Sequence, residues 1–148
     1  MNFLPSQQNS KYLKPGRLSD VLALIQVLAL DPSTYRSETG KNEGKIQGLQ
    51  GELQGTPASE NTWTKIAKEH PEFFRVNDLK GNAISLVARH VIPKNEKNIR
   101  ELPNEFVGKL LELAVDLYDR QIKLAERWTY LIPIWVSLIG AIVIFVKS

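Results

Sequence analysis

The chain has 148 residues, a net charge of +3 and no cysteine. Disulfides and thiolate metal sites are therefore excluded. The small charge differs from the concentrated positive charge of a dedicated nucleic-acid-binding protein. The length is sufficient for one small domain and its connecting segments.

The N-terminal part is predicted to be a flexible lead followed by a buried helix. Residues 1–16 are polar, and they lack the apolar core and cleavage site of a secretory signal. Ser19 is expected to cap a helix over 20–30, which Asp31 and Pro32 end. Apolar residues surround most of this helix, so we expect it deep in the core.

A short helix is predicted over 45–54 and a third helix over 60–70. Glycine recurs through the first of these at spacings of three and four residues, but no phosphate-binding pattern such as G-x-x-x-x-G-K-[ST] is present. The third helix is expected to be capped by Ser59, to bury Trp63 and to stop before Pro71.

A β-hairpin is predicted to follow. Residues 73–76 are short and aromatic, and residues 83–91 alternate between apolar and polar side chains, as in a half-buried strand. The intervening segment 77–82 is rich in turn-forming residues. Residues 93–103 are then a charged linker.

The element order helix, short helix, helix, strand, turn, strand resembles a winged helix-turn-helix domain over about residues 18 to 92. The residues that carry the resemblance are those of the buried first helix together with Trp63, Phe73, Phe74 and Leu86. The resemblance implies a mainly α domain over 17–92 with a small β-hairpin as the wing. Winged helices contact both nucleic acids and proteins, so the fold alone does not choose between them.

A second resemblance covers the segment 63–89. Its run from Trp63 through Pro71 and Phe74 to Arg89 is similar to an uncharacterised family of small bacterial membrane-anchored proteins. This resemblance implies a bacterial inner-membrane location, and it implies no particular activity.

An amphipathic stalk helix is predicted over 104–127, with Asn104 as its cap. Two apolar stripes run along it at alternating spacings of three and four. We expect the stripes to pack on the chain's own domain, or alternatively to bundle several copies of the chain. The residues proposed for self-association are Leu110, Leu117 and Leu124, with Ser137 and Ala141 further along.

Residues 128–147 are predicted to form a single transmembrane helix. The stretch 128–146 carries no charged residue and, at about 1.5 Å per residue, matches a hydrocarbon layer of roughly 30 Å. More basic residues precede it than follow it, which predicts a tail anchor with a cytosolic N-terminus. Pro133 is expected to kink the helix.

The outer face of the third helix and the wing form the predicted partner surface. Its residues are Asn61, Thr62, Lys65, Lys68 and Lys80. On DNA, the helix lysines would meet phosphates, but glutamates at 60, 69 and 72 lie in the same segment. The function predicted first is therefore protein interaction or regulation at the membrane. The alternatives are a membrane-tethered DNA-binding regulator and a self-assembling structural membrane subunit.

No enzymatic activity, cofactor or metal is predicted. His70 and His90 are the only histidines, and both are expected to be structural, with His70 half-buried on the apolar face of its helix. Glu69, His70 and Glu72 could in principle bind a metal, but metal ligands on one helix need i,i+3 or i,i+4 spacing, and Pro71 breaks that helical geometry.

Overall fold

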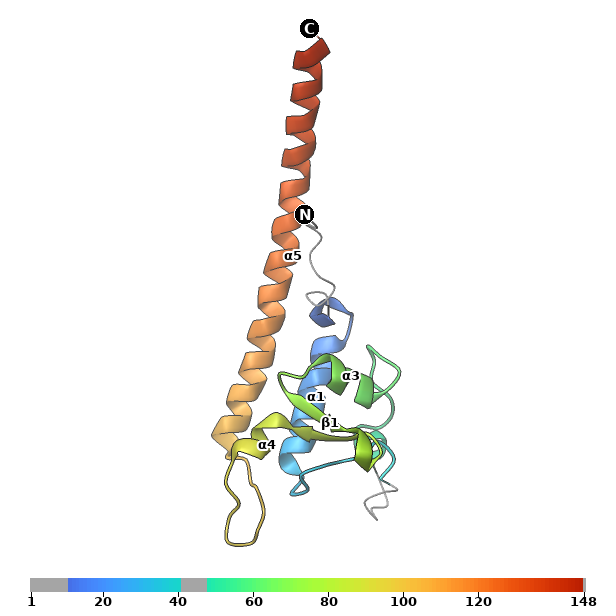
Figure 1. Ribbon diagram of the computed structural model, residues 1–148, viewed down its shortest axis with the longest axis vertical. Helices are drawn as coiled ribbons and strands as arrows, with labels where there is room; N and C mark the ends of the chain where they lie inside the picture. Colours follow the sequence, from blue (N-terminus) through green and yellow to red (C-terminus); the bar gives the residue numbers. More distant parts are fainter. Residues whose placement is uncertain (1–10, 41–47, 148) are drawn as a thin grey trace.

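The computed structural model describes the backbone of residues 11–40 and 48–147, and the side chains of these ranges except those of 128 and 140–147. In chain order the elements are α1 (Arg17–Leu30), α2 (Leu49–Glu52), α3 (Trp63–Glu69), β1 (Phe74–Asn77), η3 (Asp78–Lys80), β2 (Ala83–Leu86), α4 (Val87–Val91) and α5 (Asn104–Lys147). The described part of the chain is thus mainly helical with a two-stranded antiparallel hairpin, as predicted. Figure 1 shows a small body gathered beside the first part of the long helix α5.

Helix α1 lies in the core, as its composition predicted. Val21, Leu24 and Ile25 are fully buried and pack in one apolar cluster with Trp63 and Ile66 of α3. The helix begins three residues earlier than predicted, at Arg17, because Gly16 adopts a left-handed conformation (φ +78°) as its N-cap. Each Å² of apolar surface removed from water contributes about 25 cal/mol, so the burial of such side chains supplies most of the body's stability.

The segment before α1 belongs to the folded body from residue 11 onward. Tyr12, which the sequence placed in a flexible lead, is only 1% exposed and contacts the ring of His70. The rest of the predicted lead, residues 1–10, lies outside the described residues.

Helix α2 is a single turn and replaces the longer helix predicted over 45–54, of which residues 45–47 lie outside the described part. Two backbone hydrogen bonds hold the start of α2 to the preceding loop. Leu49 N donates to Ser37 O and Gln50 N donates to Glu38 O, each at 3.1 Å. A Cβ added to Gly48 would fall well inside contact distance of the Glu38–Gly40 backbone. Glycine is therefore required for this close approach.

Gly48→Ala is accordingly expected to destabilise the protein by about 1–3 kcal/mol, because two backbone segments would have to separate. Urea denaturation would measure the change in the free energy of unfolding. Gly108→Ala is the matched control: no described atom within 4 Å would meet its new Cβ, and this position lies within α5, so a gain of up to about 1 kcal/mol is expected. Equal effects at the two glycines would contradict the steric argument.

Helix α3 starts later than predicted because the expected cap residue is used elsewhere. The Ser59 hydroxyl donates to Asp20 at 2.5 Å and accepts from Arg17 Nε at 2.8 Å. Thr62 caps the helix instead, and its Oγ1 accepts from the Lys65 backbone N–H at 3.2 Å. Trp63 is buried, as predicted, and its indole N–H donates to Gly55 O at 2.8 Å.

The predicted hairpin is present, with Phe74 opposite Leu86 and Asn77 opposite Ala83. Its second strand is shorter than predicted: it ends at Leu86, and Val87–Val91 turns into the short helix α4. A single bridge between Arg36 and Ile84 adds one more pairing at the other edge of β2.

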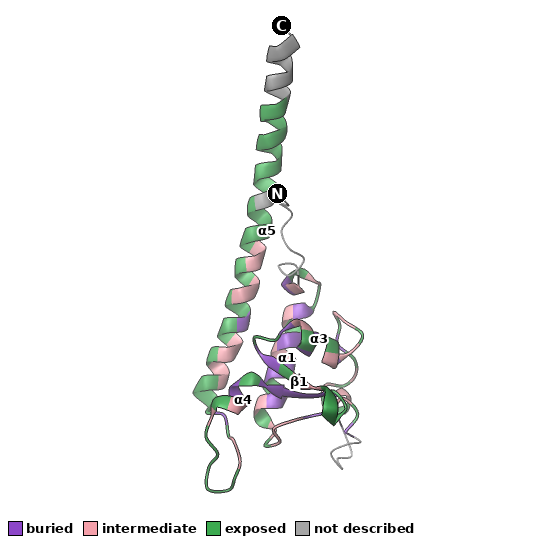
Figure 2. Ribbon diagram, in the orientation of Figure 1, coloured by how far each residue is buried: buried purple, intermediate pink, exposed green. Residues whose placement is uncertain are grey.

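Helix α5 is one continuous helix that includes both the predicted stalk and the segment after it, and it passes through Pro133. Ala114 is fully buried as part of the core cluster, and Leu110, Leu111 and Leu117 pack against that cluster. The interpretation that the stalk packs within its own chain is thus confirmed for this part. Beyond Ile122 the described side chains of α5 are exposed (Figure 2).

The prediction of a transmembrane helix over 128–147 is corrected. Among the residues that the structure describes, no helix is long and apolar enough to cross a membrane. A crossing takes about 20 consecutive apolar residues, whereas the described side chains of the predicted span are those of 129–139. The predicted tail anchor, the cytosolic N-terminus of a single-pass protein and the bacterial inner-membrane location are corrected with it.

Candidate interaction surface

The predicted partner surface on α3 and the turn of the hairpin lies on the outside of the body. Asn61, Lys65, Lys68 and Lys80 are exposed, whereas Thr62 is partly covered and is occupied with capping α3. These positions stay a predicted surface, and their exposure is compatible with contact to a partner.

The cations of this surface are already engaged by neighbouring side chains. Lys65 Nζ lies 2.5 Å from Glu60 Oε1, and Lys68 Nζ lies 3.1 Å from Asp78 Oδ1. Lys80 Nζ stands 5.1 Å from the centre of the Tyr35 ring. Phosphate contacts dominate non-specific affinity for nucleic acids. Lysines that already face carboxylates or an aromatic ring would therefore bind phosphates weakly.

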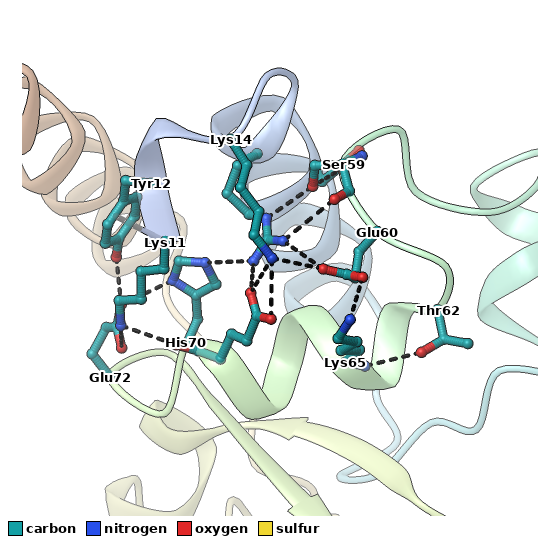
Figure 3. A network of polar contacts seen from close by, with 12 residues as sticks. Lys11, Tyr12, Lys14, Ser59, Glu60, Thr62, Lys65, His70 and Glu72 are labelled. Atoms are coloured by element: carbon teal, nitrogen blue, oxygen red, sulfur yellow. Dashed lines mark hydrogen bonds and ion pairs between the residues drawn. The ribbon is translucent and has the colours of Figure 1, made fainter. Parts of the chain in front are cut away.

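A buried polar network is centred on Arg17, whose side chain is 0% exposed. Figure 3 shows Lys14, Glu60 and His70 of this network. Arg17 Nη2 lies 3.1 Å from Glu60 Oε2, and Nη1 forms an ion pair with Glu69. Lys14 reaches the same two carboxylates, at 2.8 and 3.3 Å. The network therefore joins the start of α1 to the segment before α3 and to the end of α3.

His70 extends this network and is fully buried, more deeply than predicted. Its Nδ1 lies 3.0 Å from Glu72 Oε1, and its Nε2 lies 3.5 Å from Arg17 Nη1. Both contacts are satisfied when a neutral ring donates from Nδ1 and accepts at Nε2. Burial lowers the pKa of His70 and outweighs the opposing effect of Glu72.

Glu72 collects three donors at one carboxylate. Lys11 Nζ lies 2.8 Å from both of its oxygens, and the Tyr12 hydroxyl and His70 also donate to it. Burial by itself would raise the pKa of Glu72, but these hydrogen bonds prevail and lower it to about 2. Burial, followed by the hydrogen bond to Glu72, raises the pKa of Tyr12.

We expect the free energy of unfolding to fall as the pH drops below about 6.5. The folded-state pKa of His70 lies below the ordinary histidine value of 6.5, so the unfolded chain binds the proton more readily and stability is lost on acidification. Glu72, with a folded-state pKa below the ordinary glutamate value of 4.5, adds a further loss below that pH. Urea denaturation from pH 8 to pH 2 would measure both phases.

His70→Gln is expected to flatten the first of these two phases. The pKa of His90 is also lowered, by burial and then by Arg75 and Arg100, and its Nε2 lies 2.7 Å from Ser85 Oγ. His90→Gln is therefore the matched control that separates the two histidines. An unchanged slope between pH 6.5 and 5 in His70→Gln would contradict the assignment.

A second feature is an open groove of about 430 Å³ between α1 and α5. Leu22, Leu111 and Val115 supply its apolar lining. Its acidic members follow one flank of α5; they are Glu112, Asp116 and Asp119. This groove could not be predicted from the sequence, because its walls come from helices far apart in the chain. The available signal was an apolar stripe on α5 with acidic residues beside it.

The structure divides the residues predicted for self-association. Leu110 and Leu117 pack against the core of their own chain, whereas Leu124 is 47% exposed. Ser137 is exposed, and its Oγ donates to Pro133 O at 2.8 Å. The side chain of Ala141 lies outside the described residues.

No metal site emerges in the part of the chain that the structure describes, where no three potential ligands come together. No family model, no curated protein and no solved structure matches the chain. The winged helix-turn-helix resemblance and the resemblance to a bacterial family therefore stay predictions.

Proposed function

We propose that the protein is a protein-interaction module in which a compact body holds α5 as an extended contact element. The supporting observation is the exposed apolar surface of α5 beyond the body. Residues 130–139, here called the arm, include Tyr130, Ile132 and Trp135, which are 76%, 60% and 61% exposed. Large contiguous apolar patches are rare on proteins that act alone, and they mark interaction sites.

The body supports this role by fixing the direction of α5. Ala114 is fully buried and Leu117 packs on the core cluster, so the helix is held on α1 before it projects outward. A contact element that is already ordered loses little conformational entropy when a partner binds. Burying side chains such as Ile132 and Trp135 would contribute about 25 cal/mol per Å² of apolar surface removed from water.

Nucleic-acid binding is less well supported. The three lysines of the predicted surface face Glu60, Asp78 and the Tyr35 ring. Each would exchange an existing contact for a phosphate. The apolar arm, in contrast, has no use in phosphate recognition.

Site-specific photo-cross-linking in cells tests the proposal. A photoreactive phenylalanine analogue at Trp135 is expected to give discrete adducts with protein. The same group at Leu79, which is 99% exposed on the wing, is the control for random collision. Protein adducts at 135 that are absent at 79 would support an interaction module. Equal patterns at both positions, or adducts at 135 that contain only lipid, would contradict it.

A further inference from the structure

We infer that a second copy of this chain occupies the α1–α5 groove, with the two α5 helices antiparallel. The inference names a partner for α5 and therefore rests on the proposed function. It concerns residues 108–129, which precede the arm.

The charges of α5 are arranged in two consecutive blocks. Residues 112–119 contain three acidic residues and no basic one, whereas residues 120–127 contain three basic residues and one acidic one. A parallel pair of α5 helices would place acid beside acid and base beside base. An antiparallel pair places the acidic block of each copy beside the basic block of the other. Because the pair has twofold symmetry, this attraction occurs twice.

The side chains required for this pairing share one side of the helix. Val115 and Ile122 are seven residues apart, which is two turns, so they lie on the same face next to the groove. Val115 is 38% exposed and lines the groove, and Ile122 is half-buried. Asp116 and Lys123 are also seven residues apart and lie together on the adjoining flank, beside Glu112.

These positions define a register. When Val115 faces Ile122 of the second copy, Lys123 of that copy lies level with residue 114, between Glu112 and Asp116. Arg120 already pairs with Asp116 of its own helix at 2.8 Å, whereas Lys123 lies level with the acidic pair and is the cation that bridges the two copies. Gly108 lies at the end of the contact and presents no side chain, which allows the second helix to approach closely.

This register also brings two residues of like charge close together. Asp119 lies near the twofold axis and therefore close to Asp119 of the second copy. Repulsion between the two carboxylates opposes the pair, and removing it strengthens the pair. This predicts opposite effects for two charge changes on one helix face: Lys123→Glu weakens association at least tenfold, and Asp119→Asn strengthens it.

Disulfide trapping in the full chain tests the orientation, because the chain has no cysteine of its own. Val115→Cys and Ile122→Cys variants, one of them carrying a mass tag, are mixed and oxidised. The antiparallel pair is expected to give mainly the mixed 115–122 disulfide, several-fold above either homodimer. Predominance of the 115–115 and 122–122 disulfides would show a parallel pair and overturn the inference. Yields no higher than for Leu79→Cys would also overturn it.

Sedimentation equilibrium of the full chain supplies the second readout. The Asp116→Lys, Lys123→Asp double variant exchanges the two charges and is expected to restore the association that Lys123→Glu loses. A monomeric wild-type chain would overturn the inference, as would equal association constants for all variants. Protein adducts at Trp135 together with a monomeric chain would overturn this inference and leave the proposed function standing. A monomeric chain that also gives no protein adducts at Trp135 would reject both the inference and the proposed function.

Discussion

Arg17→Met is expected to lower the free energy of unfolding by roughly 3 kcal/mol. Removing one partner of a buried ion pair typically costs about 3–5 kcal/mol, because the other charge is left without compensation. Arg17 is fully buried and serves Glu60, Glu69 and Ser59 at once. Lys14 also reaches both carboxylates, which places the expected loss at the lower end of that range. Urea denaturation at pH 7 would measure it.

Lys65→Met is the matched control for this prediction. Lys65 also pairs with Glu60, but its side chain is more than half exposed, and exposed pairs contribute about 0–1 kcal/mol. The comparison therefore separates the buried contact from an exposed contact to the same carboxylate. Equal losses in the two variants would show that Arg17 contributes no more than an ordinary surface charge.

The apolar part of the fold was predictable because it follows local patterns. The periodicity of α1, the burial of Trp63 and the pairing of the two strands all depend on side chains close together in the sequence. The boundaries were less predictable. Ser59 has the chemistry of a cap, yet Asp20 and Arg17, about 40 residues away, determine its role.

The buried charges were not predictable from the sequence. Arginine is almost never fully buried without a partner, and the carboxylate partners of Arg17 lie far along the chain. Arg17 meets Glu69 across 52 positions, and Arg36, also fully buried, pairs with Glu52 and Asp31. Because no local signal marks such pairs, the polar network and the α1–α5 groove emerged only from the three-dimensional arrangement.

On the candidate surface, too, the exposure of the side chains was predictable from the sequence, whereas most of their partners were not. Exposure of Lys65, Lys68 and Lys80 was predictable from helical spacing and turn chemistry. Their engagement was only partly visible in the sequence: Glu60 is a near neighbour of Lys65, but Asp78 reaches Lys68 only because the turn at 78–80 folds back toward α3. A surface that looks basic in the sequence is thus largely neutralised.

Arg89→Met is the second substitution with a large expected effect, a loss of at least about 3 kcal/mol. Helix α1 has no basic residue in its last turn, and Arg89 of α4 supplies the missing donors. Its Nη2 lies 2.9 Å from Leu28 O and from Ala29 O and also donates to Asp31 O. Its Nη1 donates to Arg100 O at 2.5 Å. Buried carbonyls that lose a donor cost about 1–3 kcal/mol each.

Two further variants make this prediction specific. Arg89→Lys keeps the charge but loses the planar fork, so a substantial part of the loss is expected to remain. Arg100→Met, which removes only a 3.3 Å contact to the Arg89 carbonyl, is expected to cost under about 1 kcal/mol. Amide hydrogen exchange adds a local readout: in Arg89→Met the last turn of α1 should exchange faster than its first turn. Uniform acceleration along α1 would instead indicate general destabilisation, and the capping role would be rejected.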